Sequence, residues 1–118
     1  MIRVLIVDDE PVFRRQLRRL LTEAGLLIVA EARNIAEAEL HVRTQKPDLA
    51  VVDLMLPDID GMEGIARLKA LCPHLRVILV SVIQAHVELI RAAAVEAGAE
   101  DFLPKDSLSV RVVQSWGE

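Results

Sequence analysis

The sequence predicts an α/β fold, a three-layer sandwich in which helices cover both faces of a five-stranded parallel sheet. Two observations predict it: continuous apolar runs rich in β-branched residues recur along the chain, and segments of helical period separate them. Such runs are typical of strands buried on both faces, and their alternation with helices favours right-handed crossovers. With 118 residues and no internal linker or repeat, we expect one domain over 1–118.

Five segments are predicted strands. The first four are apolar runs that a parallel sheet would bury, and the fifth is a short segment that follows a glycine. They cover residues 3–7, 26–30, 49–52, 77–80 and 101–103.

Apolar residues at helical spacing predict the first two helices. Phe13, Leu17 and Leu21 recur every four residues in the first helix, with arginines on the opposite side and Gly25 as the terminal residue. Asn34 with Glu37 three residues later predicts the start of the second helix, which ends before Pro47.

Three further helices complete the series. The third is expected between a cap at Asp60 and Pro73, and the fourth over residues 87–97, ending at Gly98. The last is expected to begin at a Ser107 cap, and its apolar residues at spacing four are Leu108, Val112 and Trp116.

Composition excludes several function classes. With 14 basic and 18 acidic residues, the net charge of −4 lacks the positive field that DNA or an anionic membrane attracts. No apolar run approaches the roughly 20 residues of a membrane span, so we expect neither a signal peptide nor an anchor. The single cysteine, Cys72, favours a reducing, cytoplasmic location. The three histidines form no ligand-spaced pair, which argues against a transition-metal site.

Polar residues follow the predicted strands. Asp8, Asp9 and Glu10 follow the first strand, and Asp53 follows the third. Ser81 follows the fourth strand and Lys105 the fifth. Because ligands of such sheets bind beyond the carboxyl ends of the strands, we expect these side chains to converge at one edge.

Carboxylates that converge in a cleft repel one another, and a bound cation would neutralise this repulsion. Oxygen ligands without a paired His or Cys favour a hard cation, and Mg²⁺ is preferred to Ca²⁺ where few carboxylates meet a phosphate oxygen. A carboxylate beside such an ion can attack phosphorus and form an aspartyl phosphate, and Asp53 is the candidate nucleophile.

Four stretches carry a family resemblance. They are VLIVDDE at 4–10, VVDLMLPDIDG at 51–61, Ser81, and AGAEDFLPK at 97–105. At these residues the chain resembles the receiver domain of bacterial two-component response regulators, from Ile2 to about Trp116. The resemblance implies a flavodoxin-like sheet of strand order 2-1-3-4-5.

The resemblance also implies roles for individual residues. Asp53 would accept a phosphoryl group from a phosphohistidine on a sensor histidine kinase. Asp9, Asp53 and the Met55 carbonyl would bind Mg²⁺ directly, and Asp8 through water. Ser81 and Lys105 would hold the phosphoryl oxygens, and Phe102 would be the aromatic switch residue that turns inward as Ser81 moves.

The implied function is signalling rather than enzymatic catalysis beyond the domain's own phosphorylation and dephosphorylation. Phosphorylation would alter a partner interaction, including homodimerisation, at the face of the fourth helix, fifth strand and fifth helix. Residues 102–107 and the loop after Asp53 most resemble those regulators that carry a helix-turn-helix output domain and regulate transcription. No residues remain here for an output domain, through which alone DNA binding is expected.

Some positions depart from the family pattern. Val82 follows Ser81 where a small residue is usual, and it is expected to crowd the path of the phosphoryl group. Pro104 precedes Lys105, and Asp106 follows it, where the family usually has proline. The interval between Ser81 and Lys105 is also longer than usual, with the extra length placed at 82–86. Apolar Met55 and Ile83 predict slow self-dephosphorylation, because polar side chains there would orient water.

Several alternatives stay open. One alternative is that the chain is a receiver-like dimerisation module that is never phosphorylated. Less favoured alternatives are an aspartate-nucleophile phosphatase that uses Asp8, and a flavin-binding protein. Glu10 and Asp58 are interpreted as surface charge. The arginines of the first helix are interpreted as a solvated face, with the weaker hypothesis that they steer an acidic partner; they are Arg14, Arg15, Arg18 and Arg19.

Overall fold

Strands and helices alternate along the chain in the computed structural model, which describes residues 1–118. The strands are β1 (Arg3–Val7), β2 (Leu27–Ala32), β3 (Leu49–Asp53), β4 (Arg76–Ser81) and β5 (Asp101–Pro104). The helices are α1 (Pro11–Glu23), α2 (Ile35–Gln45), α3 (Gly61–Leu71), α4 (Val87–Ala97) and α5 (Val110–Ser115), with a 3₁₀ turn at Lys105–Ser107. None of these helices combines the length and apolar character that spanning a membrane requires.

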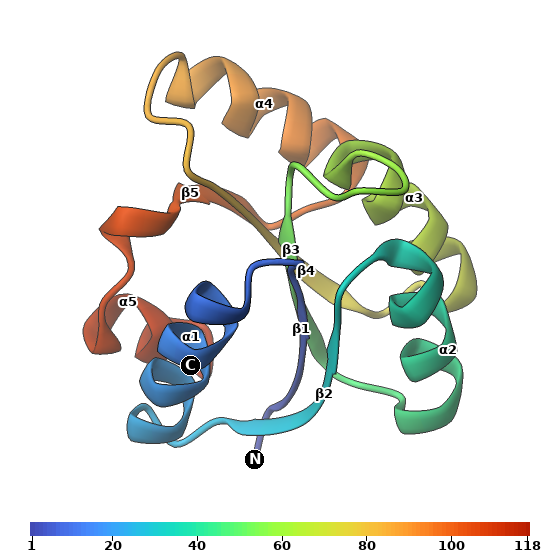
Figure 1. Ribbon diagram of the computed structural model, residues 1–118, viewed down its shortest axis with the longest axis vertical. Coiled ribbons are helices and arrows are strands. Elements are labelled where there is room, and N and C mark those ends of the chain that lie inside the picture. The colour runs from blue at the N-terminus through green and yellow to red at the C-terminus, as the bar shows by residue number, and fades with distance from the viewer.

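The five strands form one parallel sheet of order β2-β1-β3-β4-β5 (Figure 1). This confirms the predicted α/β fold and strand order. In the register, Val7 pairs with Val52, and Asp53 pairs with Val80. The carboxyl ends of β1, β3 and β4 therefore lie side by side at one edge of the sheet.

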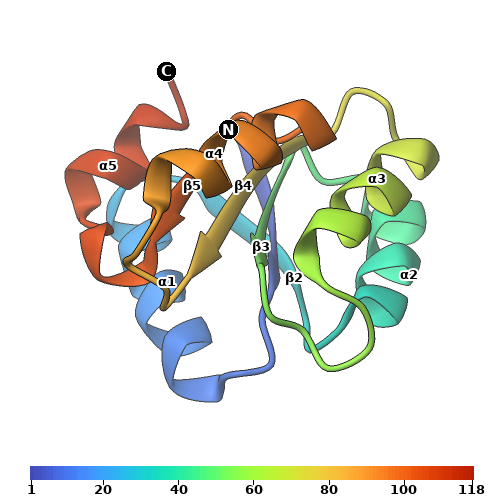
Figure 2. The ribbon, with the colours of Figure 1, turned by 90° about the horizontal axis from the view of Figure 1, so that it is seen from above.

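Both faces of the sheet are buried, which explains the continuous apolar runs. Successive strand residues point to opposite faces, so Val4 and Ile6 belong to one core and Leu5 and Val7 to the other. Helices α1 and α5 cover the first face, and α2, α3 and α4 the second; Figure 2 shows α1 and α5 on the opposite side of the sheet from α2 and α3.

Most helix ends follow the predicted residues. Asn34 accepts the Glu37 amide at 2.8 Å, and Asp60 accepts the Glu63 amide at 3.0 Å. Gly25 and Gly98, which follow α1 and α4, have φ of +86° and +115°. Glycine adopts this left-handed conformation without a steric penalty, so both helices end where glycine allows the chain to turn.

Several predicted boundaries were wrong. Strand β2 spans 27–32 and not 26–30, β4 extends one residue beyond each end of the predicted 77–80, and β3 and β5 each end one residue later than predicted. Leu108 and Trp116 lie outside α5. Strand β2 begins at Leu27 because the Leu26 amide bonds the Leu21 carbonyl at 2.9 Å and completes the end of α1. Helix α5 begins after Ser109, whose Oγ accepts the Val112 amide at 3.2 Å. Ser107 instead donates to the Pro104 carbonyl at 2.8 Å within the 3₁₀ turn, so it is not the cap.

Candidate functional site

Three carboxylates meet at the carboxyl edge of the sheet. Asp53 is the last residue of β3, and Asp8 and Asp9 directly follow the neighbouring β1. One oxygen of each lies within 4.8 Å of the others; Asp8 and Asp53 are buried, and Asp9 is exposed. The structure thus brings together the three acids that the sequence placed at a common metal site.

Each buried carboxylate has one oxygen bound by the backbone. Asp8 Oδ1 accepts the Glu10 amide at 2.8 Å, and Asp53 Oδ1 accepts the Met55 amide at 3.2 Å. These short local bonds fix both carboxylates as their strands end. The second oxygen of each carboxylate is left to face the site.

Lys105 lies against those second oxygens. Its Nζ is 2.7 Å from Asp8 Oδ2 and 3.4 Å from Asp53 Oδ2, and its side chain is 12% exposed. Asp8 Oδ2 is buried, and its short contact with Lys105 is an ion pair that lacks hydrogen-bond geometry. The ammonium contacts two of the three clustered carboxylates, so the cluster carries an excess of negative charge.

The electrostatics of Asp53 reflect this excess. Burial raises the pKa of Asp53, and the negative charge of Asp8 raises it further, while the Met55 amide and Lys105 act in the opposite direction. The donor set consists only of oxygens, and the buried Asp8 Oδ2 is met by the Lys105 ammonium and accepts no hydrogen bond. These residues fit a hard divalent cation, which would favour the ionised form of Asp53.

Ser81 and Phe102 lie beside the acids on β4 and β5. Ser81 is buried, and its Oγ accepts the Ile83 amide at 3.2 Å, so the hydroxyl holds the first residues of the β4–α4 loop. Phe102 is fully buried in the core beneath α4. Its backbone carbonyl accepts from Arg91 of α4 at 2.9 Å, which ties that helix to β5. The switch roles of Ser81 and Phe102 stay predictions.

Phe13 is a neighbour of the site that the sequence indicated only as a core residue. Its ring centroid lies 4.2 Å from Lys105 Nζ. The helical period of α1 placed Phe13 in the apolar stripe, but nothing in that pattern indicated contact with a lysine 92 positions away along the chain.

The departures from the family pattern have local structural consequences. Val82 is 68% exposed and lines a pocket of about 460 Å³ together with Val12 and Phe13. Pro104 ends β5, an edge strand, where a missing amide donor is tolerated. Asp106 accepts from Gln84 Nε2, so the longer β4–α4 loop is tied to the turn that carries Lys105.

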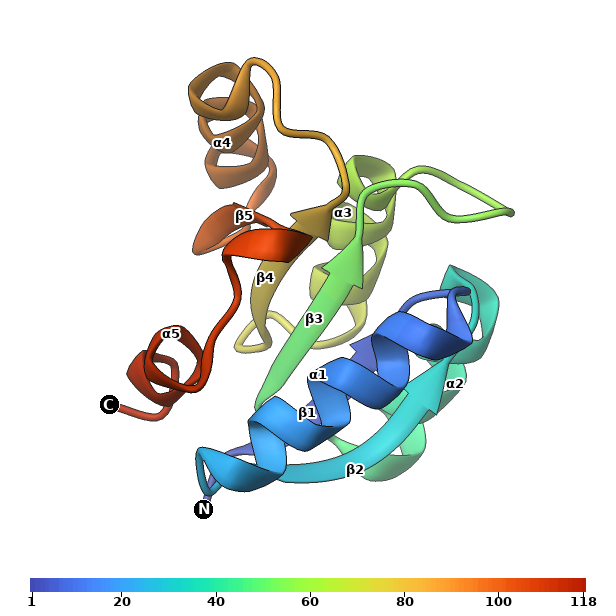
Figure 3. The same cartoon turned by 60° about the vertical axis from the view of Figure 1, so that its left-hand side comes forward.

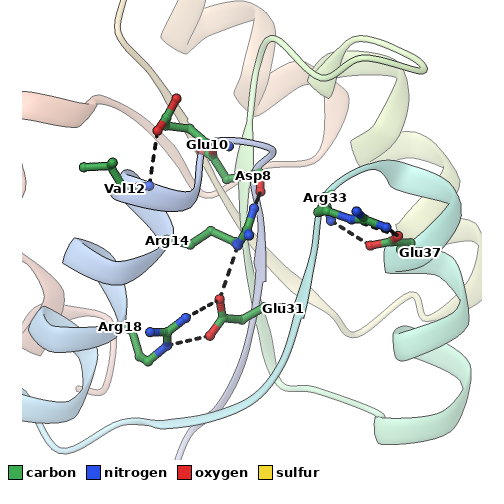
Figure 4. Close-up of polar contacts among 8 residues, drawn as sticks. All are labelled: Asp8, Glu10, Val12, Arg14, Arg18, Glu31, Arg33 and Glu37. Atoms are coloured by element: carbon green, nitrogen blue, oxygen red, sulfur yellow. Dashed lines mark hydrogen bonds and ion pairs between the residues drawn. The ribbon is translucent and has the colours of Figure 1, made fainter.

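Two acids interpreted as surface charge are exposed, as predicted, and each also accepts a hydrogen bond at the start of a helix. Glu10 is the N-cap of α1 and accepts the Val12 amide at 3.2 Å (Figure 4). Asp58 accepts the amides of Ile35 and Ala36 at 3.2 and 3.1 Å, at the start of α2. The Asp58 contact was not predictable from sequence patterns because its partners lie more than 20 residues away along the chain.

The arginines of α1 are only partly a solvated face. Arg18 forms a two-pronged hydrogen bond with Glu31 of β2, at 2.6 and 2.8 Å, and Arg14 lies 3.4 Å from the same carboxylate (Figure 4). Arg14 also donates to the Asp8 carbonyl at 2.7 Å. Arg15 and Arg19 remain exposed. Two of the four arginines, Arg14 and Arg18, therefore fasten α1 to the sheet.

Gly61 allows α3 to begin directly against the site. A Cβ at this position would lie 2.5 Å from the Asp53 carbonyl and 2.8 Å from Leu54 Cα. The Gly61 amide bonds the Leu54 carbonyl at 2.7 Å. Because backbone atoms cannot yield as a flexible side chain does, this close approach requires glycine.

Comparison with characterised proteins agrees with this arrangement. The chain is 34% identical over 113 residues to the chemotaxis protein CheY of Thermotoga maritima, which covers 96% of this chain and 92% of CheY. It is 41% identical over 105 residues to a putative transcriptional regulator of Pseudomonas aeruginosa; the match covers 89% of this chain but half of that relative's length.

Solved structures agree as well. The signal receiver domain of the putative response regulator NarL from Mycobacterium tuberculosis is 31% identical with a TM-score of 0.86, over 98% of this chain and 92% of that one. CheY in the CheX–CheY–BeF₃–Mg²⁺ complex of Borrelia burgdorferi is 25% identical with a TM-score of 0.85, over 97% and 84%. The family model described as the response regulator receiver domain matches residues 4–115. The chain therefore belongs to the response regulator receiver domain family.

Proposed function

We propose that Asp53 accepts a phosphoryl group from a phosphohistidine of a sensor histidine kinase, in a reaction that requires Mg²⁺. The observation that carries this proposal is the site itself: oxygens of three carboxylates lie within 4.8 Å of one another, and the Lys105 ammonium lies beside Asp8 and Asp53. A cation and a lysine at one carboxylate are the groups that transfer of a phosphoryl group to that carboxylate needs.

The transfer proceeds by attack of an Asp53 carboxylate oxygen on phosphorus. The new O–P bond forms as the P–N bond to the imidazole breaks, and the imidazole leaves with the electron pair as a neutral ring, because its other nitrogen already carries a proton. Lys105 and Ser81 hold oxygens of the transferring group. Asp9, Asp53 and the Met55 carbonyl would hold Mg²⁺, and Asp8 would act through water. The ion neutralises negative charge on the acids and on the phosphoryl oxygens.

The consequence of phosphorylation is proposed to be a change of partner at the α4–β5–α5 face. Ser81 would donate its hydroxyl hydrogen to a phosphoryl oxygen, and its movement toward that oxygen would weaken the bond from the Ile83 amide that holds the β4–α4 loop. Phe102, which is already buried in this structure, would adjust its packing with Ser81. Exposed Leu89 and Val95 on α4 are apolar side chains available to a second copy of the chain or to another protein. Transcriptional output through an attached DNA-binding domain and a cytoplasmic location belong to the same proposal.

Phosphorylation can be tested directly with a small phosphodonor and Mg²⁺, followed by intact mass. We expect the wild type, but not Asp53→Asn, to gain the mass of one phosphoryl group, and chelation of Mg²⁺ to abolish the gain. Asp58→Asn is a matched control, because it removes a carboxylate from an adjacent loop outside the cluster. An equal mass gain in Asp53→Asn would contradict the assignment.

Size-exclusion chromatography of the same samples separates the two candidate functions. A phosphorylation-dependent change in elution supports the switch. The alternative, a dimerisation module that is never phosphorylated, predicts a constant dimer and no mass gain. Exposed Leu89 and Val95 could contact a partner in either case, so the mass measurement decides between the two candidate functions.

A further inference from the structure

Lys105 has two kinds of contact in this structure. Its ammonium meets the carboxylates of Asp8 and Asp53, and it also lies over the ring of Phe13 at 4.2 Å from the centroid. This separation is within the roughly 6 Å at which a cation is attracted to the negative face of an aromatic ring.

The two carboxylate contacts compete with other ligands of the same acids. Asp8 and Asp53 belong to the carboxylate cluster that fits a divalent cation, and a cation there would draw on the same oxygens that Lys105 faces. The ring of Phe13 has no such competitor. It also accepts no conventional hydrogen bond, so all three N–H donors of the ammonium stay available to oxygen atoms.

The ring itself is held rigidly with respect to the site. Phe13 is 7% exposed in the core between α1 and the sheet. The first turn of α1 is fastened to Asp8 by the Glu10 amide and by the Arg14 side chain, at 2.8 and 2.7 Å (Figure 4). A fixed ring next to a long, flexible side chain restricts where the ammonium can lie.

We infer that Phe13 is a positioning residue for Lys105: its ring face keeps the ammonium at the site when a cation and a phosphoryl group occupy the carboxylates. This inference rests on the proposed function and deepens it. It assigns to the start of α1 a share in phosphoryl binding that acts through Lys105 and not by contact with phosphate.

Fluorinated phenylalanines at position 13 test the ring face separately from its shape. Each added fluorine weakens the negative face while the ring keeps nearly the same size. The pocket of about 460 Å³ beside Phe13 gives room for the added atoms and for the hydroxyl of Phe13→Tyr. Phe13→Leu removes the ring and keeps an apolar side chain.

The measurement is calorimetric titration of the whole chain, first with Mg²⁺ alone and then with beryllofluoride in saturating Mg²⁺. We expect the Kd for beryllofluoride to rise stepwise from mono- to trifluorophenylalanine, by about fivefold to tenfold in total, and similarly in Phe13→Leu. Phe13→Tyr should stay within about twofold of wild type, because it keeps the ring face. The Kd for Mg²⁺ alone should change by less than about twofold, because Phe13 contributes no ligand atom.

A second readout follows the lysine itself. In the NMR spectrum, the Hε protons of Lys105 should be shifted upfield by the Phe13 ring, and the shift should persist when Mg²⁺ and beryllofluoride bind. Loss of that shift on binding, or a beryllofluoride Kd that is flat across the fluorine series, overturns this inference alone. Failure of the wild type to bind beryllofluoride overturns the proposed function and the inference with it.

Discussion

Helices α1 and α4 both begin near the carboxylate cluster, but they are anchored very differently. Helix α1 buries Phe13, Leu17 and Leu21, and Glu10 caps its first turn. Helix α4 buries only Ala94, and the preceding residue His86 makes no side-chain cap bond. Figure 3 shows α4 at the outer end of the sheet beyond β5. One flank of the site is therefore fixed by buried apolar side chains, whereas the other is attached mainly by half-buried residues and by the bonds of Arg91 with β5.

The difference indicates which flank can move. Elements with few buried apolar side chains and unsatisfied termini open at lower free energies than core elements. The loop leading into α4 is held by the Ser81 hydroxyl and by the Gln84–Asp106 contact. A signal that changes Ser81 therefore acts on the weakly held helix, while α1 keeps the acids and Lys105 in place.

Truncating one buried and one exposed leucine tests this difference most strongly. Leu17→Ala in α1 should lower the free energy of unfolding by about 3 kcal/mol, because Leu17 is fully buried and leaves a cavity. Leu89→Ala in α4 should lower it by less than about 0.5 kcal/mol, because Leu89 is 71% exposed. Urea titration measures both. Equal losses would break the comparison.

Native-state hydrogen exchange measures the same contrast without mutation. The amides of α4 should open at a free energy roughly 2 kcal/mol below those of α1, within the range that separates local from global opening. Amide exchange resolved by NMR at several low urea concentrations gives these values. If α4 exchanged only through global unfolding, α4 would not be the mobile flank.

The start of α2 supplies a third, well-capped terminus for comparison. Asp58→Ala should lower the free energy of unfolding by about 1 kcal/mol, because two backbone amides lose their acceptor. Burial raises the pKa of Asp58, but its hydrogen bonds with backbone amides, Ile35 and Ala36 among them, outweigh burial and hold the pKa below its usual value.

The pH dependence of that loss has a defined sign. A lowered pKa in the folded chain means that the stabilisation is fully present above the unfolded pKa of about 3.9 and disappears as the pH falls through the folded value. Thermal unfolding of wild type and Asp58→Ala between pH 7 and pH 3 should show the two curves converging at the acid end. A difference that grew with acid would contradict the assignment of Asp58.

The smallest expected effect is at His86, where α4 begins. This residue has φ of +57°, in the left-handed region that most side chains disfavour. His86→Asn should raise the free energy of unfolding by about 0.5 kcal/mol, because asparagine adopts this conformation more readily. Chemical denaturation detects the gain, and His86→Val, which should destabilise, is the control. A gain in both variants would mean that backbone conformation is not the cause.

The fold was predictable because the apolar strand runs and the residues at the helix ends indicate the same architecture. Strand residues such as Val4 to Val7 are apolar at every position, and Gly25 and Gly98 mark helix ends that require positive φ. The start of α5 was not predictable in the same way. Ser107 and Ser109 are equivalent as caps in sequence, and only the 3₁₀ turn after Pro104 selects the second.

The acids of the site were predictable because strand ends in a parallel sheet converge. Contacts between side chains from separate elements were not. Phe13 meets Lys105, Glu31 meets Arg18, and Asp58 meets the start of α2 only after the helices dock. Such contacts depend on helix placement to within a few ångströms, which neither apolar periodicity nor spacing along the chain specifies.

The two-sided burial of β3 restricts how this gene segment can change length. Deleting one residue within β3 would move each later side chain of the strand from one core to the other and draw Asp53 back by about 3.3 Å. Fold and chemistry would then fail together, so insertions and deletions tolerated over evolutionary time are expected in the loops and not in this strand.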